Sequence, residues 1–285
     1  MPYDLPFAWG ARTYVMGIVN VTPDSFSGDG LYQDGGDVAA AVAQARAFEA
    51  AGADLIDVGG ESTRPGHEPV DEEIERARIV PAIQAIAGAV SIPISVDTYK
   101  AAVAAAALEA GARIVNDVWA LAADPAMAGL VARAGVPVVL MHNQEGTAYR
   151  DLVPEVIGAL AARVRVAEEA GIARSRIVVD PGIGFGKTGA HNLELIDRLG
   201  EFRVLRLPIL LGASRKRFIG RILGDDGDDA PPEERLEGTA AAVAVGIAHG
   251  ADVVRVHDVA AIVKVARVAD AITRRPVAGA PAALS

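Results

Sequence analysis

The chain repeats one local pattern eight times, and this repeat restricts the fold more than any other feature. Each unit has a short apolar run rich in β-branched residues, then a polar or glycine-rich loop, and then an alanine-rich amphipathic segment. Short continuous apolar runs are typical of parallel strands, which are buried on both faces. We predict strands at Tyr14–Val19, Leu55–Val58, Pro93–Val96, Ile114–Val115, Pro137–Met141, Ile177–Val179, Pro208–Leu211 and Val253–Val256.

Segments of helical period lie between these strands, and several of them end at a glycine, as helices often do. The clearest predicted helices are Val38–Ala51, Glu72–Ala87, Ala101–Ala110, Val153–Ala170 and Thr239–His249. Eight strand–helix units favour an α/β fold of the closed (β/α)8 TIM-barrel type over an open sheet.

No linker separates the units, so we predict a single domain over residues 1–285. Residues 1–12 are irregular and are expected to cap one end of the barrel. The acidic, proline-containing stretch Gly224–Glu237 is interpreted as a solvated excursion within the seventh unit, and residues 276–285 as a frayed tail.

The composition excludes several classes of function. A net charge of −10 disfavours nucleic acid as a partner, and the lack of cysteine excludes disulfides and thiol chemistry. The amino terminus does not have the pattern of a signal peptide, and no apolar run approaches the roughly 18 to 20 residues of a membrane-spanning helix. We therefore expect a soluble, cytoplasmic protein with no membrane partner.

Polar residues occur where each predicted strand ends. In barrels of this type the catalytic residues lie at the carboxyl ends of several strands at once. These residues are Asn20, Asp57, Asp97, Asn116 with Asp117, His142 with Asn143, Asp180, Ser214 to Lys216, and Arg255 with His257 and Asp258. A capping Asp, Asn or Ser explains one or two of them, but not eight, so we predict a functional site at this mouth.

One part of the predicted site is suited to a flat polar ring. Carboxylates at Asp97 and Asp180 and the amide of Asn116 match a heterocycle edge that alternates N–H donors with C=O acceptors. The stretch Val178–Thr188 adds three glycines after Asp180, which allow tight turns and close approach. This stretch is not a phosphate-binding P-loop, because Pro181 stands where that motif needs glycine.

The other part of the site is suited to an anion. Arginine forms paired hydrogen bonds with phosphate, and histidine, amide and hydroxyl groups add donors. The residues of this part are Arg255, His257, Asn20, Thr63 and Arg64, and Lys216 is placed to connect the two parts.

Seven stretches of the sequence resemble the dihydropteroate synthases. They extend along nearly the whole chain and occur in the same order as in that family. They are MGIVNVTPDSFSGDG (Met16–Gly30), IDVGGESTRPG (Ile56–Gly66), ISVDT (Ile94–Thr98), IVNDV (Ile114–Val118), VVDPGIGFGKT (Val178–Thr188), LLGASRKRFIG (Leu210–Gly220) and VRVHDV (Val254–Val259). The resemblance implies a transferase on a (β/α)8 barrel that joins 6-hydroxymethyl-7,8-dihydropterin diphosphate to p-aminobenzoate and releases diphosphate. It also implies a homodimer, and it places the chain in a family of sulfonamide targets.

The resemblance also implies roles for individual residues. The pterin would be bound by Asp97, Asn116, Asp180 and Lys216. The diphosphate would be held by Asn20, Thr63, Arg255 and His257, with Mg2+ coordinated at Asn20. The p-aminobenzoate would contact Phe26, Arg64, Pro65, Phe185, Ser214 and Lys216. Catalysis would depend on Lys216, Arg255, His257, Asp97 and Asp180, with the loops Thr22–Gly28 and Ser62–Gly66 closing over the site.

Two features and two alternative functions stay open at this stage. The segment Asn143–Ala148 departs from the family's pattern after the fifth strand, and Asp57 is interpreted either as ordering loops or as holding Arg255. A pterin-binding methyltransferase would share the barrel and the pterin anchors, but it would not need the STRPG and SRK strings. A catalytically silent paralogue would be expected to have lost parts of the first two loops, which are complete here.

Overall fold

A computed structural model describes residues 4–21, 36–61, 70–225 and 227–274. Within these ranges eight parallel strands form one sheet in the order β6-β5-β4-β3-β2-β1-β8-β7. A parallel bridge between Val179 and Ile209 joins the two edge strands, so the sheet closes on itself. The strands are β1 (Tyr14–Asn20), β2 (Leu55–Gly59), β3 (Ile94–Asp97), β4 (Ile114–Asp117), β5 (Val138–Met141), β6 (Ile177–Asp180), β7 (Leu210–Leu211) and β8 (Val253–Val256).

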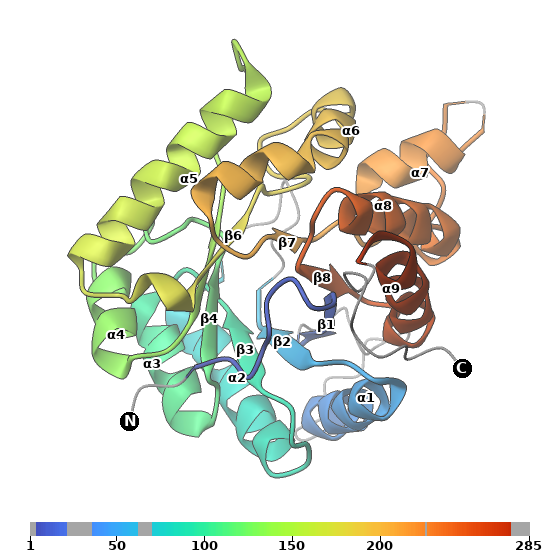
Figure 1. Cartoon of the computed structure of the whole chain (residues 1–285). Helices are drawn as coiled ribbons and strands as arrows, with labels where there is room; N and C mark the ends of the chain where they lie inside the picture. Colours follow the sequence, from blue (N-terminus) through green and yellow to red (C-terminus); the bar gives the residue numbers. More distant parts are fainter. Residues whose placement is uncertain (1–3, 22–35, 62–69, 226, 275–285) are drawn as a thin grey trace, which may run out of the picture.

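Helices surround the barrel and alternate with its strands, as Figure 1 shows. The α-helices are α1 (Gly36–Ala51), α2 (Glu72–Ala87), α3 (Ala101–Ala110), α4 (Met127–Ala134), α5 (Leu152–Glu169), α6 (Gly189–Asp197), α7 (Arg217–Leu223), α8 (Leu236–Ala248) and α9 (Val259–Thr273). Short 3-10 helices occur at η1 (Arg174–Arg176), η2 (Leu199–Leu205) and η3 (Pro232–Glu234). The prediction of a (β/α)8 TIM barrel is therefore confirmed.

Prolines account for most of the small differences at the predicted strand starts. Strands β3 and β5 begin one residue after Pro93 and Pro137, because proline has no backbone N–H to donate to a neighbouring strand. The carbonyls of these prolines still accept, from the backbone N–H groups of Ile56 and Val115 at 3.0 Å in both cases. The prolines thus extend the sheet as acceptors only.

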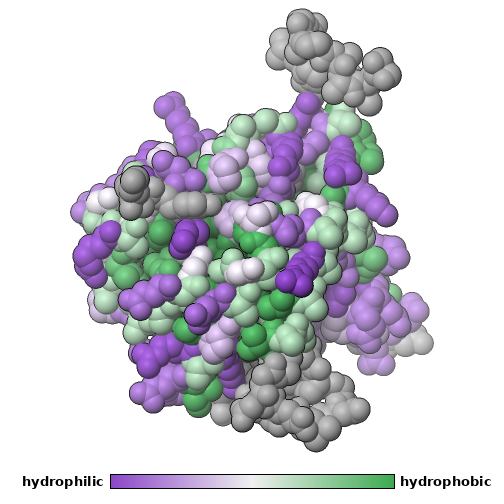
Figure 2. All heavy atoms as spheres, turned by 90° about the horizontal axis from the view of Figure 1, so that it is seen from below, coloured by the Kyte–Doolittle hydropathy of each residue, from purple (hydrophilic) through white to green (hydrophobic). Residues whose placement is uncertain are grey.

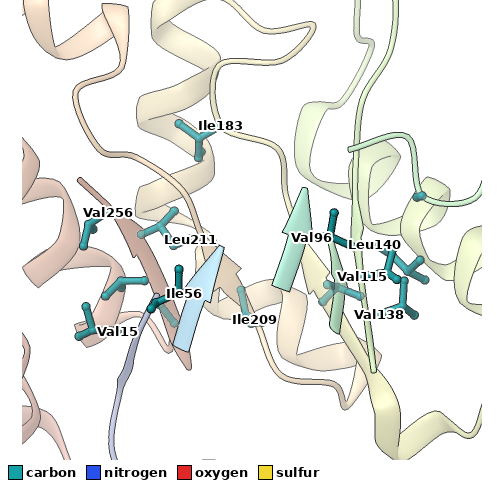
Figure 3. Packing of buried hydrophobic residues seen from close by; sticks show 14 of the residues in the cluster. Val15, Ile56, Val96, Val115, Val138, Leu140, Ile183, Ile209, Leu211 and Val256 are labelled. Atoms are coloured by element: carbon teal, nitrogen blue, oxygen red, sulfur yellow. The ribbon is translucent and has the colours of Figure 1, made fainter. Parts of the chain in front are cut away.

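The strands bury two separate apolar layers because their side chains alternate between the two faces. The outward layer packs against the helices, and Figure 3 shows part of it, including Val15, Ile56 and Val256. The inward layer fills the barrel, and it is formed by Tyr14, Met16, Leu55, Ile114, Val139, Val178, Leu210 and Val253.

The amino-terminal segment crosses one end of the barrel (Figure 1). Leu5, Phe7 and Trp9 pack against the inward layer, and the ring of Phe7 stacks on that of Tyr14 at 4.1 Å between centroids. This is the position expected for a segment that caps one end of the barrel. The tail at 276–285 lies outside the described residues.

The acidic stretch between α7 and α8 is exposed along most of its length, as predicted, but one residue corrects that interpretation. Arg235 is buried, and its guanidinium donates to the backbone carbonyls of Ala230 at 2.7 Å and Arg215 at 2.9 Å. Helix α8 starts directly after this anchor, at Leu236, three residues earlier than predicted.

Hydrophilic residues are interspersed among hydrophobic ones over the face of the molecule shown in Figure 2. Among the helices that the structure describes, none combines the length and the apolar character that crossing a bilayer requires.

Candidate active site

Strand register aligns the first candidate residues in one row at the carboxyl end of the barrel. Asn20 pairs with Gly59, Gly59 pairs with Asp97, and Asp97 pairs with Asn116. Residues in register on neighbouring strands lie side by side, so this row crosses four adjacent strands. Asn20, Asp97 and Asn116 therefore share one face of the barrel mouth.

The alternation of strand side chains explains why these residues point inward. A residue two positions after an inward apolar residue faces the same side of the strand. The resulting pairs are Leu55 with Asp57, Ile114 with Asn116, Val178 with Asp180, and Val253 with Arg255. The apolar layer fills the barrel, and the polar layer above it forms the floor of the mouth.

Asp57 and Asp97 hold the guanidinium of Arg255 from two sides. Arg255 Nε donates to Asp57 Oδ2 at 2.6 Å, and Arg255 Nη2 donates to Asp97 Oδ2 at 2.7 Å. The side-chain amide of Asn116 also donates to Asp57 Oδ2, at 3.0 Å. Asp57 is fully buried, so of its two possible roles the structure supports the one that holds Arg255.

Two acceptors in this network, Asp57 Oδ1 and Asp97 Oδ1, have no hydrogen-bond partner among the described residues. Asp97 is 7 % exposed, and its Oδ1 accepts no hydrogen bond from the described residues. An unpaired buried acceptor costs free energy, which a ligand that donates a hydrogen bond would recover. Asp97 Oδ1 is therefore a candidate contact for an N–H group of a bound ring.

Burial changes the protonation of both predicted pterin-binding carboxylates. It raises the pKa of Asp97 from 3.8 to about 7, against the opposing effect of Arg255. It likewise raises the pKa of Asp180 to about 6, against the N–H of Gly182 and the charge of Lys216. A ligand that donates hydrogen bonds or carries positive charge would favour the ionised forms.

Asp180 starts the glycine-rich turn and fixes its first residue. Asp180 Oδ1 accepts from the backbone N–H of Gly182 at 2.7 Å. Gly182 has a φ of 74°, and a side chain there would overlap the carbonyl oxygen of His142. The predicted tight turn is present, but at Gly182 the close approach is to the segment after β5.

Lys216 and Phe185 come together from two different loops. The ammonium of Lys216 lies 4.1 Å from the centroid of the Phe185 ring, within the range of a cation–π contact. Lys216 immediately precedes α7 and follows Arg215, whose positive φ of 55° turns the chain. Arg215 forms an ion pair with Asp258, so the basic run is not simply a solvated helix start.

Ser214 lies against His257 in this structure. Its Oγ is 3.0 Å from His257 Nδ1 and accepts the backbone N–H of His257 at 3.2 Å. Ser214 and His257 are thus hydrogen-bonded to each other, although Ser214 is predicted to contact p-aminobenzoate and His257 to contact diphosphate. Asp117, which follows Asn116, accepts from the backbone N–H groups of Trp119 and Leu121 and so shapes the turn after β4.

Asn20, the last residue of β1, offers a hard oxygen ligand at the mouth of the barrel. The described ranges contain no group of three or more His, Cys, Asp or Glu side chains that could hold a metal by themselves. Mg2+ typically keeps several waters and shares phosphate oxygens of its substrate, so a single protein oxygen fits a metal that binds together with a diphosphate.

Four predicted site residues cannot be placed. Phe26, Thr63, Arg64 and Pro65 lie outside the described residues, as do both predicted closing loops over their whole length.

The atypical segment Asn143–Ala148 contacts the far end of the glycine-rich turn. A side chain at Gly186 would come within 2.5 Å of the carbonyl oxygen of Gln144. The hydroxyl of Tyr149, directly after this segment, donates to the carbonyl of Gly186 at 2.8 Å.

His142, which the sequence analysis places at the mouth without a specific role, contacts Lys187, which it did not single out. Lys187 Nζ lies 3.0 Å from His142 Nδ1. The sequence did contain one signal for this contact, because Lys187 directly follows a glycine-rich turn at the end of a strand.

The closed parallel barrel with a layer of polar side chains at the carboxyl ends of its strands is the architecture of an α/β-barrel enzyme. The family model described as "Pterin binding enzyme" matches residues 16–257. The dihydropteroate synthase of Bacillus subtilis is 49 % identical over 264 residues, which cover 93 % of this chain and 90 % of that protein.

Solved structures agree with this assignment. The Xanthomonas albilineans dihydropteroate synthase with 4-aminobenzoic acid matches with a TM-score of 0.87 and 45 % identity, covering 94 % of this chain and 95 % of that one. The structure from the same organism in complex with 7,8-dihydropteroate matches with a TM-score of 0.85 and 43 % identity, covering 94 % and 97 %. The chain belongs to the pterin-binding enzymes and, within them, to the dihydropteroate synthase family, so the methyltransferase and silent-paralogue alternatives are not favoured.

Proposed function

We propose that the protein condenses 6-hydroxymethyl-7,8-dihydropterin diphosphate with p-aminobenzoate, giving 7,8-dihydropteroate and diphosphate. The observation that carries the proposal is the buried row of Asp97 and Asn116 beside Arg255. One carboxylate oxygen of Asp97 in this row accepts no hydrogen bond from the described residues. Family membership supports the reaction type, and the polar groups of the mouth suit both ends of the pterin substrate.

The pterin is bound by Asp97, Asn116, Asp180 and Lys216 in this proposal. The ring N–H groups donate to the two carboxylates, which holds both in the ionised form despite their raised pKa values. Asn116 is already oriented by its hydrogen bond to Asp57, so little conformational freedom is lost when the ring binds.

The diphosphate is held by Asn20, Arg255 and His257, together with Thr63. Asn20 would hold Mg2+, which would supply positive charge that stabilises the leaving group. Arg255 is positioned by Asp57 and Asp97, and Ser214 holds the His257 ring in place. In this proposal these donors stabilise the negative charge that develops on the diphosphate as the C–O bond breaks, as electrostatic catalysis requires.

The p-aminobenzoate binds on the side of Phe185, Lys216 and Ser214, with Phe26, Arg64 and Pro65 contributed by the first two loops. The aryl amine attacks the pterin methylene as the C–O bond breaks, and the ionised Asp97 and Asp180 stabilise positive charge on that carbon. An aniline nitrogen is already nucleophilic, so the chain needs neither a covalent intermediate nor a strong base.

The oligomeric state and location are part of the same proposal. We infer a cytoplasmic homodimer from the family membership and from the acidic, cysteine-free composition. Analytical ultracentrifugation tests the dimer, because a monomer at micromolar concentration would contradict it.

The proposed reaction is tested by identifying its product. Purified protein is mixed with the pterin diphosphate, p-aminobenzoate and Mg2+, and the mixture is separated by chromatography with mass detection. The proposal predicts 7,8-dihydropteroate that forms in proportion to enzyme. If hydrolysis of the pterin diphosphate were the only reaction, the protein would not be a synthase.

A further inference from the structure

Lys187 connects two loops of the barrel mouth through a cluster of acceptors. Its ammonium donates to the backbone carbonyl of Phe185 at 2.8 Å, lies 3.0 Å from His142 Nδ1, and is 3.5 Å from the carbonyl oxygen of His142. A lysine ammonium carries three donors and no acceptor, so all three contacts can form together. Lys187 thus ties the turn after β6 to the carboxyl end of β5.

His142 is placed to act as an acceptor. It is 7 % exposed, and its backbone N–H donates to the carbonyl of Asp180 at 2.9 Å, which fixes it beside β6. Burial, followed by the charge of Lys187, lowers the pKa of His142 to about 4, so the ring is neutral near pH 7. When Lys187 is protonated it can only donate, so Nδ1 is then the unprotonated nitrogen of the ring and the proton is on Nε2.

The environment of Lys187 has the features of a positioning site rather than a surface salt bridge. Burial lowers the pKa of Lys187 to about 7, with Asp180 opposing this shift and Lys216 adding to it. Among the described residues its hydrogen-bond partners are two backbone carbonyls and one imidazole nitrogen, with no carboxylate. Its contacts therefore fix backbone atoms.

The turn held by Lys187 carries an aromatic ring of the mouth. Phe185 supplies the ring that lies 4.1 Å from the ammonium of Lys216. The neighbouring residues of the turn are fixed by other groups, since Asn192 accepts the N–H of Gly184 at 2.7 Å and Tyr149 donates to Gly186. Lys187 completes this set by fixing the carbonyl of Phe185.

We propose that Lys187, held by its contact with His142, is a positioning residue for the transfer reaction. It fixes the backbone of Phe185 and thereby the aromatic ring that contacts p-aminobenzoate. This inference rests on the proposed function, because the ring of Phe185 is assigned to the second substrate. It adds two residues to the site, and neither of them touches a reacting atom.

The test compares variants that distinguish the hydrogen-bonding ammonium of Lys187 from its aliphatic chain. Lys187→Met keeps an apolar chain without donors, Lys187→Arg keeps charge and donors, and Lys264→Met is the matched control at an exposed lysine on α9. Diphosphate release is measured with each substrate varied in turn, and thermal unfolding is recorded for each variant. Lys187→Met is expected to raise the KM for p-aminobenzoate about tenfold or more, and the KM for the pterin diphosphate less than about threefold.

Two further comparisons are specific to positioning. Lys187→Arg is expected to recover at least part of the lost p-aminobenzoate KM, and His142→Leu is expected to produce the same KM split as Lys187→Met. Because the two side chains act through one contact, the double variant should be no worse than the more impaired single variant.

Several outcomes would overturn the inference. These are an equal rise in both KM values, an unchanged p-aminobenzoate KM, or a fall in melting temperature with no KM split. If Lys187→Met does not fold, Lys187→Gln and His142→Leu carry the same comparison. Wild-type protein that releases no diphosphate would contradict the proposed function itself, whereas active wild type with an unaffected Lys187→Met would contradict only the role of Lys187.

Discussion

Arg255 on β8 donates to Asp97 on β3 at 2.7 Å across the mouth of the barrel. The same guanidinium donates to Asp57 on β2 at 2.6 Å, so two buried carboxylates share one cation whose side chain is 18 % exposed. Removing one partner of such a network leaves charges buried without compensation, which is more costly than the loss of a surface pair.

Arg255→Ala is therefore expected to lower the free energy of unfolding by about 3–5 kcal/mol. Arg255→Lys should recover little of it, because one ammonium cannot reproduce the fork that reaches both acids. Urea unfolding measures both effects. Arg217→Ala is the control, since that side chain is 73 % exposed and should cost less than about 1 kcal/mol. A loss below about 1 kcal/mol for Arg255→Ala would show that the network does not stabilise the fold.

Asp180 makes the ligand-free protein sensitive to pH in a defined direction. Its pKa is raised from 3.8 to about 6 by burial, so the folded state binds the proton more tightly than the unfolded state. This contribution to stability is complete below pH 3.8 and is lost as pH rises through about 6. Asp180→Asn should therefore gain about 1–3 kcal/mol relative to wild type between pH 4 and pH 7. Urea unfolding at the two pH values measures the gain, and a constant difference would contradict the assignment.

Lys216 is expected to matter for turnover and not for folding. Lys216→Ala should reduce turnover by about 100-fold or more, because it removes a cation from the site, while the melting temperature stays within a few degrees. Steady-state kinetics and thermal unfolding are measured on the same preparation, with Lys264→Ala as the control. Near wild-type turnover would remove Lys216 from the site.

Two glycines of the same region should respond in opposite ways to alanine. Gly182 has positive φ and its Cβ would overlap the carbonyl oxygen of His142, whereas an added Cβ at Gly189 at the start of α6 meets no atom within 4 Å. Gly182→Ala should destabilise by about 3 kcal/mol or more, and Gly189→Ala should be neutral or stabilise by up to about 1 kcal/mol. Urea unfolding of both variants measures the difference. Similar stabilities would mean that the turn relaxes at little cost.

The sequence allowed the barrel and the position of its mouth to be predicted, because both follow from local patterns. Continuous apolar runs marked the eight strands, and the polar residue at the end of each marked the mouth. The two-residue alternation even relates Asp57, Asn116 and Asp180 to the apolar residues beneath them. These signals need only a few neighbouring residues.

Most partners within the site could not be predicted in the same way, and holding Arg255 was only one of the two roles considered for Asp57. Arg255 contacts Asp57 across 198 residues of sequence, and Ser214 contacts His257 across 43. These distances are set by barrel closure and strand register, which no local pattern encodes. Lys187 was missed for the same reason, since its burial depends on the segment after β5, 45 residues earlier.

The most direct test of the account is a diphosphate-release assay from which each component is omitted in turn. The complete mixture holds the protein, the pterin diphosphate, p-aminobenzoate and Mg2+. The account predicts release that requires both substrates and is lost when Mg2+ is chelated. Release that is equally fast without p-aminobenzoate, or no release from a folded protein that binds the pterin diphosphate, would contradict the assignment of this site to a synthase.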